Sequence, residues 1–428
     1  MLADTIFALA SGSIRAAIAV MRISGPGAGA AVIALCRRLP PERHASVRRL
    51  RDAAGTVLDQ AVVLWMPGPS TYTGEDSVEL HLHGGRAVIE AVAGALLAAG
   101  LRPAEPGEFT RRAFLNGRMD LVEAEAVHDL IAAETEAQRR QAFRQMEGAL
   151  GAFYDDWANR VREVLGYQEA LIDFPDEDLP PQVEARLLVT LAAVRAEIAA
   201  HLNDGGRGEK LREGLFFAIT GAPNVGKSTL INALAERDVA IVSAIPGTTR
   251  DVLETRVVLG GVPVTLVDTA GLRETDDPIE AEGVRRARAR AEDADLVLRL
   301  VQAGDPAPDD GVPGLLIATK ADLGGPGPEG ALRISAVSGE GMDVLRSRLA
   351  DAARAMTETA GPPPLTHARH RAALLEASAH LAAAEAAALP ELRGEDLRLA
   401  MRAIGRITGH VGVEDILDTI FSSFCIGK

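Results

Sequence analysis

The stretch GAPNVGKST, residues 221–229, has the residue types and spacing of a phosphate-binding loop. Its glycines let successive backbone N–H groups curl around phosphate oxygens, Lys227 can reach the β- and γ-phosphates, and the Ser228 hydroxyl can ligate Mg²⁺. The apolar run LFFAIT precedes the loop and STLINALAE follows it, which predicts the strand–loop–helix context that a P-loop requires. These residues predict a site for a nucleoside triphosphate.

Four further motifs follow in the order typical of GTPases. PGTTRD predicts a switch loop in which Thr249 is a second Mg²⁺ hydroxyl. VDTAG ends an apolar strand, where Asp268 can hold Mg²⁺ through water and the Gly271 N–H can meet the γ-phosphate. TKAD stands where Asn-Lys-x-Asp reads guanine: Asp322 can accept two hydrogen bonds that adenine cannot offer. SAVSGEG fits the last base-side loop. We therefore predict GTP binding.

The predicted GTP-binding residues come from all five motifs. Thr319 replaces the asparagine that normally braces the base-reading loop, so the sequence leaves the strength of guanine selection open. The set is Asn224, Val225, Gly226, Lys227, Ser228, Thr229, Ser243, Ala244, Ile245, Pro246, Gly247, Thr248, Thr249, Asp268, Thr269, Ala270, Gly271, Thr319, Lys320, Asp322, Ser335 and Ala336.

Hydrolysis needs a polar group in place of the glutamine that small GTPases carry directly after DxxG, because Leu272 occupies that position. One replacement is a monovalent cation held by Asn224 and loop oxygens of residues 243–248, which would neutralise developing charge. Another is a carboxylate such as Glu280 in RETDDPIEAEG, which can orient water. A solvated switch loop explains the same acidic residues.

Length and composition bound the class of protein. A chain of 428 residues, 47% hydrophobic and 25% charged, predicts a soluble protein of two or three domains. Two cysteines form no disulfide framework and no metal spacing, and we expect no signal peptide or membrane span, so a cytoplasmic location is predicted. Cys36 is expected to be a small buried hydrophobe. The net charge of −15 argues against a broad nucleic-acid surface but leaves a local basic patch open.

The sequence pattern predicts a multidomain α+β and α/β protein. Residues 1–117 mix short β-like runs with Ala-rich helical stretches, which is typical of an α+β domain. Residues 118–208 are helical in pattern, with NDGGRGE near their end expected to be a linker. Residues 209–355 alternate strands with helices and predict an inserted P-loop GTPase domain with a doubly wound, parallel-type sheet. Residues 356–428 return to helix and complete the helical domain.

Taken together, GAPNVGKST, PGTTRD, DTAGLRET and the terminal FCIGK resemble the MnmE (TrmE) family of tRNA modification GTPases. The resemblance covers essentially the whole chain, including GEDSVELHLHGG, PGEFTRRAFLNGRMDLVEAEAV and LIDFPDED. FCIGK and the PGEF stretch are its most specific parts. ASGSIRAAIAVMRISG differs from the family's glycine-rich PPGRGG form, as TKAD differs from NKAD.

The resemblance implies a potassium-activated GTPase that acts on wobble uridine U34 of certain tRNAs. The N-terminal domain would bind 5-formyl- or methylene-tetrahydrofolate and form the homodimer. With the FAD protein MnmG (GidA), in a heterotetramer that provides most of the tRNA contacts, the chain would add an aminomethyl or carboxymethylaminomethyl group to C5. No membrane partner is implied.

The resemblance also assigns roles to single residues. It makes Glu280 the water-orienting carboxylate, and it places Cys425 near the one-carbon unit, either as a nucleophile or as a packing residue. From the residues alone, the folate set reads as surface charges. The implied ligands are Asn224, Ser243, Ile245 and Thr248 for K⁺, Ser228 and Thr249 for Mg²⁺, and Arg22, Glu79, Arg118 and Lys428 for folate.

Two other functions use the same motifs. A ribosome-assembly or translation-associated GTPase explains the P-loop and Leu272 but predicts a basic RNA-binding appendage, against which the acidic balance and FCIGK argue. A nucleotide-switched scaffold has the same motifs and differs from a GTPase enzyme only in that its function does not require GTP hydrolysis. A Glu280→Ala variant with intact binding separates that scaffold from an enzyme, because only the scaffold would still work.

Overall fold

The computed structural model describes residues 4–12, 16–173, 181–237, 254–268, 294–308, 311, 313–358 and 362–427. These residues form two compact units. The first comprises Met1–His128, Met146–Asn159 and Met401–Lys428, and the second comprises Asp129–Gln145 and Arg160–Ala400. Each unit has its own six-stranded sheet and its own hydrophobic core.

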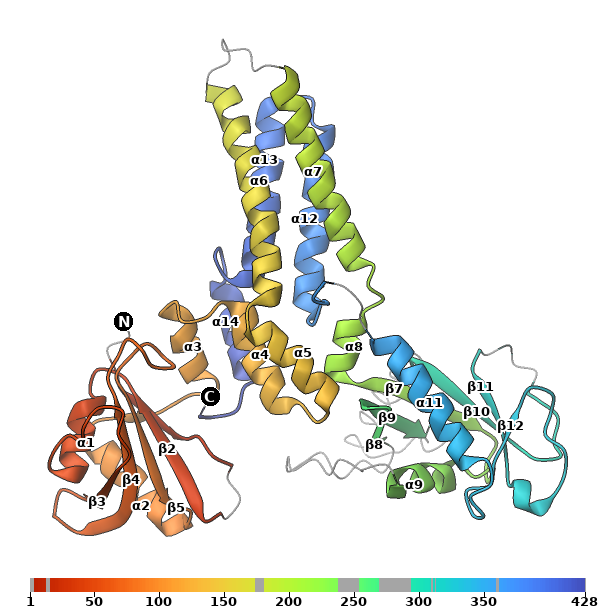
Figure 1. Ribbon diagram of the computed structural model, residues 1–428, viewed down its shortest axis with the longest axis horizontal. Helices are drawn as coiled ribbons and strands as arrows, with labels where there is room; N and C mark the ends of the chain where they lie inside the picture. Colours follow the sequence, from red (N-terminus) through yellow and green to blue (C-terminus); the bar gives the residue numbers. More distant parts are fainter. Residues whose placement is uncertain are drawn as a thin grey trace, which may run out of the picture. The chain divides into compact units, whose positions relative to one another are not determined.

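The sheet of the first unit has the order β3-β4-β5-β2-β1-β6 (Figure 1). Its neighbouring strands are antiparallel, except for the parallel pair β1 and β6. Alternation in IAVMRIS and SVELHLH buries every second side chain, and two helices cover that buried face. The elements are β1 (Ile6–Leu9), β2 (Ile18–Ser24), α1 (Ala28–Cys36), β3 (Ser46–Arg51), β4 (Val57–Met66), β5 (Ser77–His83), α2 (Arg86–Ala98) and β6 (Arg102–Pro103).

A second apolar cluster of the first unit joins helices that are far apart in the sequence. Leu121 and Ala124 pack there against Leu417, Phe421 and Phe424. The cluster thereby brings the end of the chain next to the segment that follows the N-terminal sheet. The helices concerned are α3 (Glu108–Leu115), α4 (Leu121–Ala132) and α14 (Glu414–Ser422).

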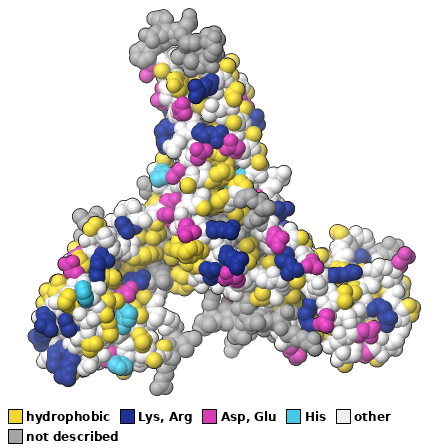
Figure 2. Space-filling model, viewed as in Figure 1, with side chains coloured by type: hydrophobic (Ala, Val, Ile, Leu, Met, Phe, Trp, Pro, Cys, Tyr) yellow, Lys and Arg dark blue, Asp and Glu magenta, His cyan; other side chains and the backbone are white. Residues whose placement is uncertain are grey.

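Long helices make up the helical part of the second unit, which also holds a short helix, α8. Ion pairs join neighbouring helices there: Arg160 with Glu197 at 2.7 Å, and Arg195 with Glu385 at 2.9 Å. Charges of both signs alternate along this surface (Figure 2). The elements are α5 (Glu136–Met146), α6 (Ala149–Asp173), α7 (Pro181–Leu202), α8 (Arg207–Glu213), α12 (Ala368–Ala386) and α13 (Pro390–Thr408).

The sheet of the second unit has the order β12-β11-β10-β7-β9-β8 and is parallel except at β8. α9 packs against β7, β8 and β9, and α11 packs against β8 and β9. This mixture of domains confirms the predicted fold class. The elements are β7 (Leu215–Gly221), α9 (Lys227–Arg237), β8 (Glu254–Leu259), β9 (Val262–Asp268), β10 (Leu296–Gln302), β11 (Leu315–Thr319), η2 (Ala321–Leu323), β12 (Leu332–Arg333) and α11 (Met342–Thr357).

Two local features differ from the sequence-based expectation. The linker expected over NDGGRGE is shorter, because α8 begins at Arg207. The antiparallel edge strand β8 was not predicted, although its turn carries a signal: Gly260 and Gly261 have φ of 62° and 85°, as a tight hairpin turn requires. Among the described helices, none is long and apolar enough to cross a membrane.

Candidate nucleotide and folate sites

The P-loop lies at the carboxyl end of β7, where parallel sheets bind ligands. Gly221 has φ of 146°, and a Cβ there would lie 2.5 Å from the Leu300 carbonyl oxygen, so only glycine fits. Asn224 also has positive φ, 60°, at the crest of the loop. Lys227 is buried, and its Nζ donates to the carbonyls of Gly221 and Ala222 at 2.9 and 3.0 Å. These bonds hold the ammonium group inside the loop.

The two hydroxyls that follow Lys227 are exposed in the first turn of α9. Ser228 and Thr229 therefore stand at the open, positive end of a helix, beside a buried cation. This is where a phosphate and its metal ion are most favourably held.

A cavity of about 190 Å³ adjoins the P-loop at the carboxyl end of β11. Lys320 has φ of 56° there, which turns the chain sharply after the strand. Ser335 is buried, and its Oγ accepts a hydrogen bond from Ser338 N at 3.0 Å, which orders the second base-side loop. The predicted base-side residues Thr319, Lys320, Asp322, Ser335 and Ala336 thus line one cavity, together with Gly226 and Thr229 of the P-loop motif.

Thr319 ties this cavity to the P-loop. Its Oγ1 lies 2.6 Å from the Val225 carbonyl oxygen and 3.1 Å from that of Val301, and the residue is 4% exposed. A hydroxyl donates one proton, so the shorter contact, with the P-loop, is the main bond. Threonine therefore makes the link between base loop and phosphate loop for which the sequence pattern expects asparagine.

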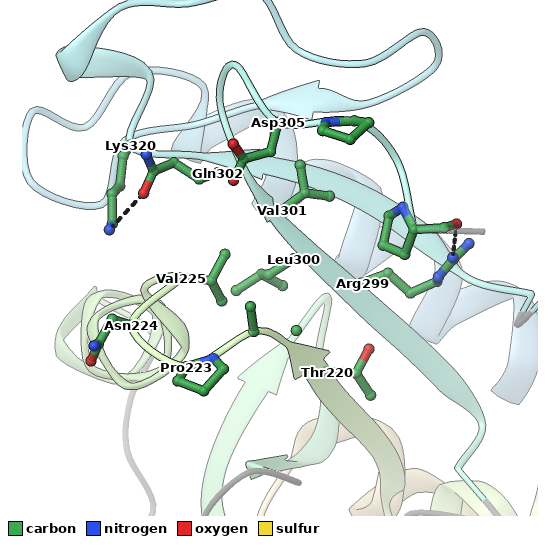
Figure 3. Close-up of a pocket in the computed structure, with 14 residues that line it drawn as sticks. Thr220, Pro223, Asn224, Val225, Arg299, Leu300, Val301, Gln302, Asp305 and Lys320 are labelled. Atoms are coloured by element: carbon green, nitrogen blue, oxygen red, sulfur yellow. Dashed lines mark hydrogen bonds between the residues drawn. The ribbon is translucent and has the colours of Figure 1, made fainter. Parts of the chain in front are cut away.

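A larger cavity, of about 470 Å³, borders the outer side of the P-loop (Figure 3). Lys320 Nζ donates to Gln302 Oε1 at 3.0 Å on its upper wall, and Arg299 Nη2 donates to the Pro308 carbonyl at 2.9 Å. Pro223 and Asn224 line its floor. Lys320 lines both cavities, so one lysine stands between them.

Many predicted nucleotide-site residues lie outside the described residues. Asp268 is described, at the end of β9 opposite Ile219 of β7. Within the described residues, no group of three or more His, Cys, Asp or Glu side chains is placed to hold a metal ion. The predicted residues outside the description are Ser243, Ala244, Ile245, Pro246, Gly247, Thr248, Thr249, Thr269, Ala270, Gly271 and Glu280, together with Lys428 of the folate set.

Arg22 and Glu79, both predicted folate ligands, face each other on β2 and β5. Arg22 donates from Nε and Nη2 to Glu79 Oε1 at 3.2 and 2.9 Å. Its guanidinium also lies 5.6 Å from the ring centre of Tyr72 and 5.8 Å from that of Phe109, which are cation–π distances. His81 Nε2 lies 3.5 Å from Glu79 Oε2. Tyr72, Phe109 and His81 were not predicted as members of this site, because only strand pairing and packing bring them next to Arg22 and Glu79.

A buried ionic network supports this site from α3. Arg112 is fully buried and donates to Glu108 at 2.9 Å, to Asp4 at 2.8 Å and to Glu75 at 3.2 Å. Burial would raise the pKa of Glu108. Hydrogen bonds from Arg102, from the Glu105 backbone N–H and from Arg112 nevertheless hold that pKa below its ordinary value. The charged network fixes the segment that carries Phe109.

The C-terminal tail docks on the same segment. The Gly107 N–H donates to the Cys425 carbonyl at 3.4 Å, and Phe424 is buried, with its ring 4.8 Å from that of His128. Gly427, with φ of 95°, is packed against the Leu9 carbonyl of β1. Cys425 itself is exposed. The tail therefore lies against the N-terminal sheet.

Arg118, the remaining described folate candidate, is exposed and borders the loop that carries Tyr72. Its Cγ lies 3.3 Å from the position that a Cβ on Gly74 would take, and Asn116 Nδ2 donates to the Thr73 carbonyl at 2.7 Å. The loop thus connects Arg118 to the side chains around Arg22.

The chain matches two family models, "GTP-binding protein TrmE N-terminus" over residues 5–118 and "MnmE helical domain" over residues 121–425. It is 63% identical to a "tRNA modification GTPase MnmE" of Gluconacetobacter diazotrophicus, over 99% of this chain and 98% of that protein. The protein of the same name from Rhodospirillum rubrum is 53% identical over the full length of both. The solved G domain of the T. maritima FeoB iron transporter is 25% identical over 32% of this chain and 98% of its own, with a TM-score of 0.22.

Proposed function

Because the chain belongs to the MnmE (TrmE) family of tRNA modification GTPases, we propose that it is a potassium-activated GTPase that modifies C5 of tRNA wobble uridine U34 together with an FAD-dependent partner. The group added would be aminomethyl or carboxymethylaminomethyl. The observation that carries the proposal is the P-loop joined through Thr319 to a base cavity, in a chain related to these proteins along its whole length.

Ser228 and Thr249 would hold Mg²⁺ beside Lys227, and Asn224, Ser243, Ile245 and Thr248 would hold K⁺. The exposed Ser228 hydroxyl at the positive end of α9 and the exposed Asn224 amide at the loop crest fit these roles. When bound, the two cations neutralise charge that develops on the phosphates. Lys227 positions the phosphates, Asp322 reads guanine, and Glu280 orients the attacking water in place of glutamine.

The site around Arg22 would bind a one-carbon tetrahydrofolate, either the 5-formyl or the methylene form. Glu79, oriented by Arg22 and flanked by His81, offers a carboxylate to the guanine-like N–H groups of a pterin. Arg118 and Lys428 would attract the glutamate tail, and the docked end of the chain would hold Cys425 near the one-carbon unit. Contacts from Arg22 to Phe109 and from Gly107 to Cys425 support this placement.

The proposed division of labour follows the predicted segments. Residues 1–117 would bind folate and form a homodimer, 118–208 and 356–428 would form the helical domain, and 209–355 would form the GTPase domain. MnmG (GidA) would supply FAD in a heterotetramer and provide most contacts with tRNA. A cytoplasmic location belongs to the same proposal.

The test is a mass-spectrometric nucleoside profile of tRNA from cells that lack this gene. We expect 5-carboxymethylaminomethyl-type uridines to be lost, and to return with the intact gene but not with a Cys425→Ser copy. An unchanged profile overturns the tRNA assignment and favours ribosome assembly. A Glu280→Ala copy that binds GTP and still restores the modification favours the nucleotide-switched scaffold.

A further inference from the structure

A group of arginines lies at the edge of the first unit's sheet, around the end of α1 and along β3. Six arginines and one glutamate stand within residues 37–51 of a chain whose net charge is −15. Arginine side chains gather in Figure 2 over the part of the unit that carries α1 and β3. We call this group the arginine patch; its members are Arg37, Arg38, Arg43, Arg48, Arg49 and Arg51.

The patch is placed by local structure and faces solvent. β3 is the last strand of its sheet, and its alternation puts Arg48 on the helix-covered face and the exposed Arg49 on the other. α1 packs against β3, the strand that carries Arg48. Arg37 and Arg38 follow Cys36, the last residue of α1, and are exposed.

The side chains of two patch members, Arg37 and Arg51, converge beside Gly55 without an acidic partner among the described residues. Arg51 Nη1 donates to the Gly55 carbonyl at 2.7 Å, and Arg37 Nη2 lies 3.7 Å from the position of a Cβ on Gly55. Arg43 donates to the Ser70 carbonyl at 2.7 Å. These bonds to carbonyl oxygens orient the side chains and leave their charge uncompensated.

The arginines of the patch differ from several others in the same unit because they have no carboxylate partner in the described part of the chain. Within the residues that the structure describes, no member of the patch forms an ion pair, and the side chains of Arg37, Arg38 and Arg49 form no hydrogen bond. By contrast, five arginines elsewhere in the unit each pair with a carboxylate, whereas Arg118 is exposed like the patch; the paired ones are Arg22, Arg86, Arg102, Arg111 and Arg112. Unpaired like charges at one place destabilise the fold, so a ligand of opposite charge accounts best for the patch.

We propose that the arginine patch binds the phosphate backbone of the tRNA substrate, as a contact of this chain's own in addition to those of a partner. The inference rests on the proposed function, which makes tRNA the polyanion that must approach an otherwise acidic chain. Several exposed guanidinium groups at a sheet edge suit a phosphate backbone, which offers repeated acceptors without sequence information.

The experiment is filter binding of an unmodified tRNA transcript to the full chain over a series of KCl concentrations. The variant is R38Q/R49Q, which removes two arginines that make no described contact. The matched control, R348Q/R402Q, removes two exposed arginines from α11 and α13 and changes the net charge equally. We expect R38Q/R49Q to bind roughly tenfold more weakly at low salt, with a salt slope shallower by about 1.4 to 1.8, since each phosphate contact contributes about 0.7 to 0.9.

Other outcomes overturn the proposal. Unchanged affinity and slope in R38Q/R49Q, or an equal loss in the control, would exclude a phosphate contact at the patch. Unchanged tRNA affinity together with lost U34 modification in cells would assign the patch to an acidic protein instead. A native urea-unfolding transition by tryptophan fluorescence in the variant excludes misfolding of the first unit, which holds both tryptophans. Failure of the native gene to restore U34 modification would count against the proposed function alone, because binding is measured separately.

Discussion

Thr319 shows how one residue can couple the two halves of a nucleotide site. Its hydroxyl donates to the P-loop carbonyl of Val225 from the end of β11, 94 positions further along the chain. The bond is buried, so its loss leaves an acceptor without a partner and costs about 1 to 3 kcal/mol.

We predict that Thr319→Val lowers the affinity for GDP by about five- to 150-fold, the equivalent of that energy. Thr319→Ser keeps the hydroxyl and is expected to bind nearly as the native protein does. Titration of a fluorescent GDP analogue measures both, and melting temperatures show whether each variant is folded. Native affinity in Thr319→Val would show that the contact does not support the site.

Glu79 is the residue at which the folate proposal is most directly tested. Replacing it with Gln keeps the shape but removes the charge that accepts hydrogen bonds from Arg22 and from a pterin. Because hydrogen bonds to charged groups contribute about 1.5 to 3 kcal/mol, we predict at least about tenfold weaker binding of 5-formyl-tetrahydrofolate in equilibrium dialysis. The control is Glu90→Gln, which breaks an exposed pair with Arg86 on α2. Equal binding by native protein and Glu79→Gln would remove Glu79 from the site.

At the scale of elements, α4 begins with a reciprocal capping interaction between Asp120 and Glu123. Glu123 N donates to Asp120 Oδ1 at 2.7 Å, and Asp120 N donates to Glu123 Oε2 at 2.8 Å. Asp120 also lies against Gly151 in the first turn of α6. Burial raises the pKa of Asp120 to about 6, and the charges of Glu123 and Asp155 add to this against backbone hydrogen bonds.

The raised pKa predicts a pH dependence of stability. Since the folded value of about 6 exceeds the ordinary 3.8, the contribution of protonated Asp120 is complete below about pH 3.8 and is lost as pH rises through 6. Asp120→Asn has no such loss. Its stability relative to the native protein should therefore increase between pH 4 and pH 7, by up to roughly 3 kcal/mol at about 1.4 kcal/mol per pH unit.

Urea unfolding followed by tryptophan fluorescence measures this difference, because both tryptophans, Trp65 and Trp157, lie in the first unit. Asp418→Asn, which alters an exposed carboxylate paired with Arg111, is the control and should track the native protein at every pH. Parallel pH profiles for Asp120→Asn and the native protein would contradict the prediction.

At the scale of the whole molecule, one carboxylate ties together the two places where the chain enters and leaves the GTPase segment. Asp129 of α4 accepts hydrogen bonds from Arg212 Nε at 2.8 Å, just before β7, and contacts His367 Nε2 at 3.0 Å, just before α12. Burial would raise the pKa of Asp129, but His367 and Arg212 hold it below 3.8. Its stabilising contribution is therefore present above about pH 4 and lost as pH falls further.

We predict that Asp129→Ala destabilises the second unit by about 1 to 3 kcal/mol, because it removes the nearly buried carboxylate that joins Arg212 to His367. Glu197→Ala, which breaks a more exposed pair, should cost under about 1 kcal/mol. Circular dichroism during urea unfolding measures this loss, and tryptophan fluorescence identifies the transition of the first unit separately, because both tryptophans lie there. A loss in Asp129→Ala no larger than that in the control would show that the two crossings are held by other contacts.

The sequence by itself determined the chemistry that is local in the chain. The P-loop needs glycines, a lysine and a hydroxyl at fixed spacing, so its sequence alone identifies it. Short apolar runs between helical segments predicted β7, β9, β10 and β11. The order of the motifs and the terminal FCIGK also indicated the family, which the comparisons confirm. Local backbone requirements and hydrophobic periodicity act over a few residues, and they are therefore written directly in the sequence.

Only the tertiary structure decided which distant residues meet. Strand register sets Arg22 opposite Glu79, and packing brings Tyr72 and Phe109 beneath the same guanidinium. The bond from Thr319 to the P-loop, like the docking of the tail on Gly107, depends on how elements far apart in the chain pack together. The arginine patch became a candidate when the sheet order placed β3 at an edge and its charges lacked partners. Such contacts depend on long-range packing, which no local pattern encodes.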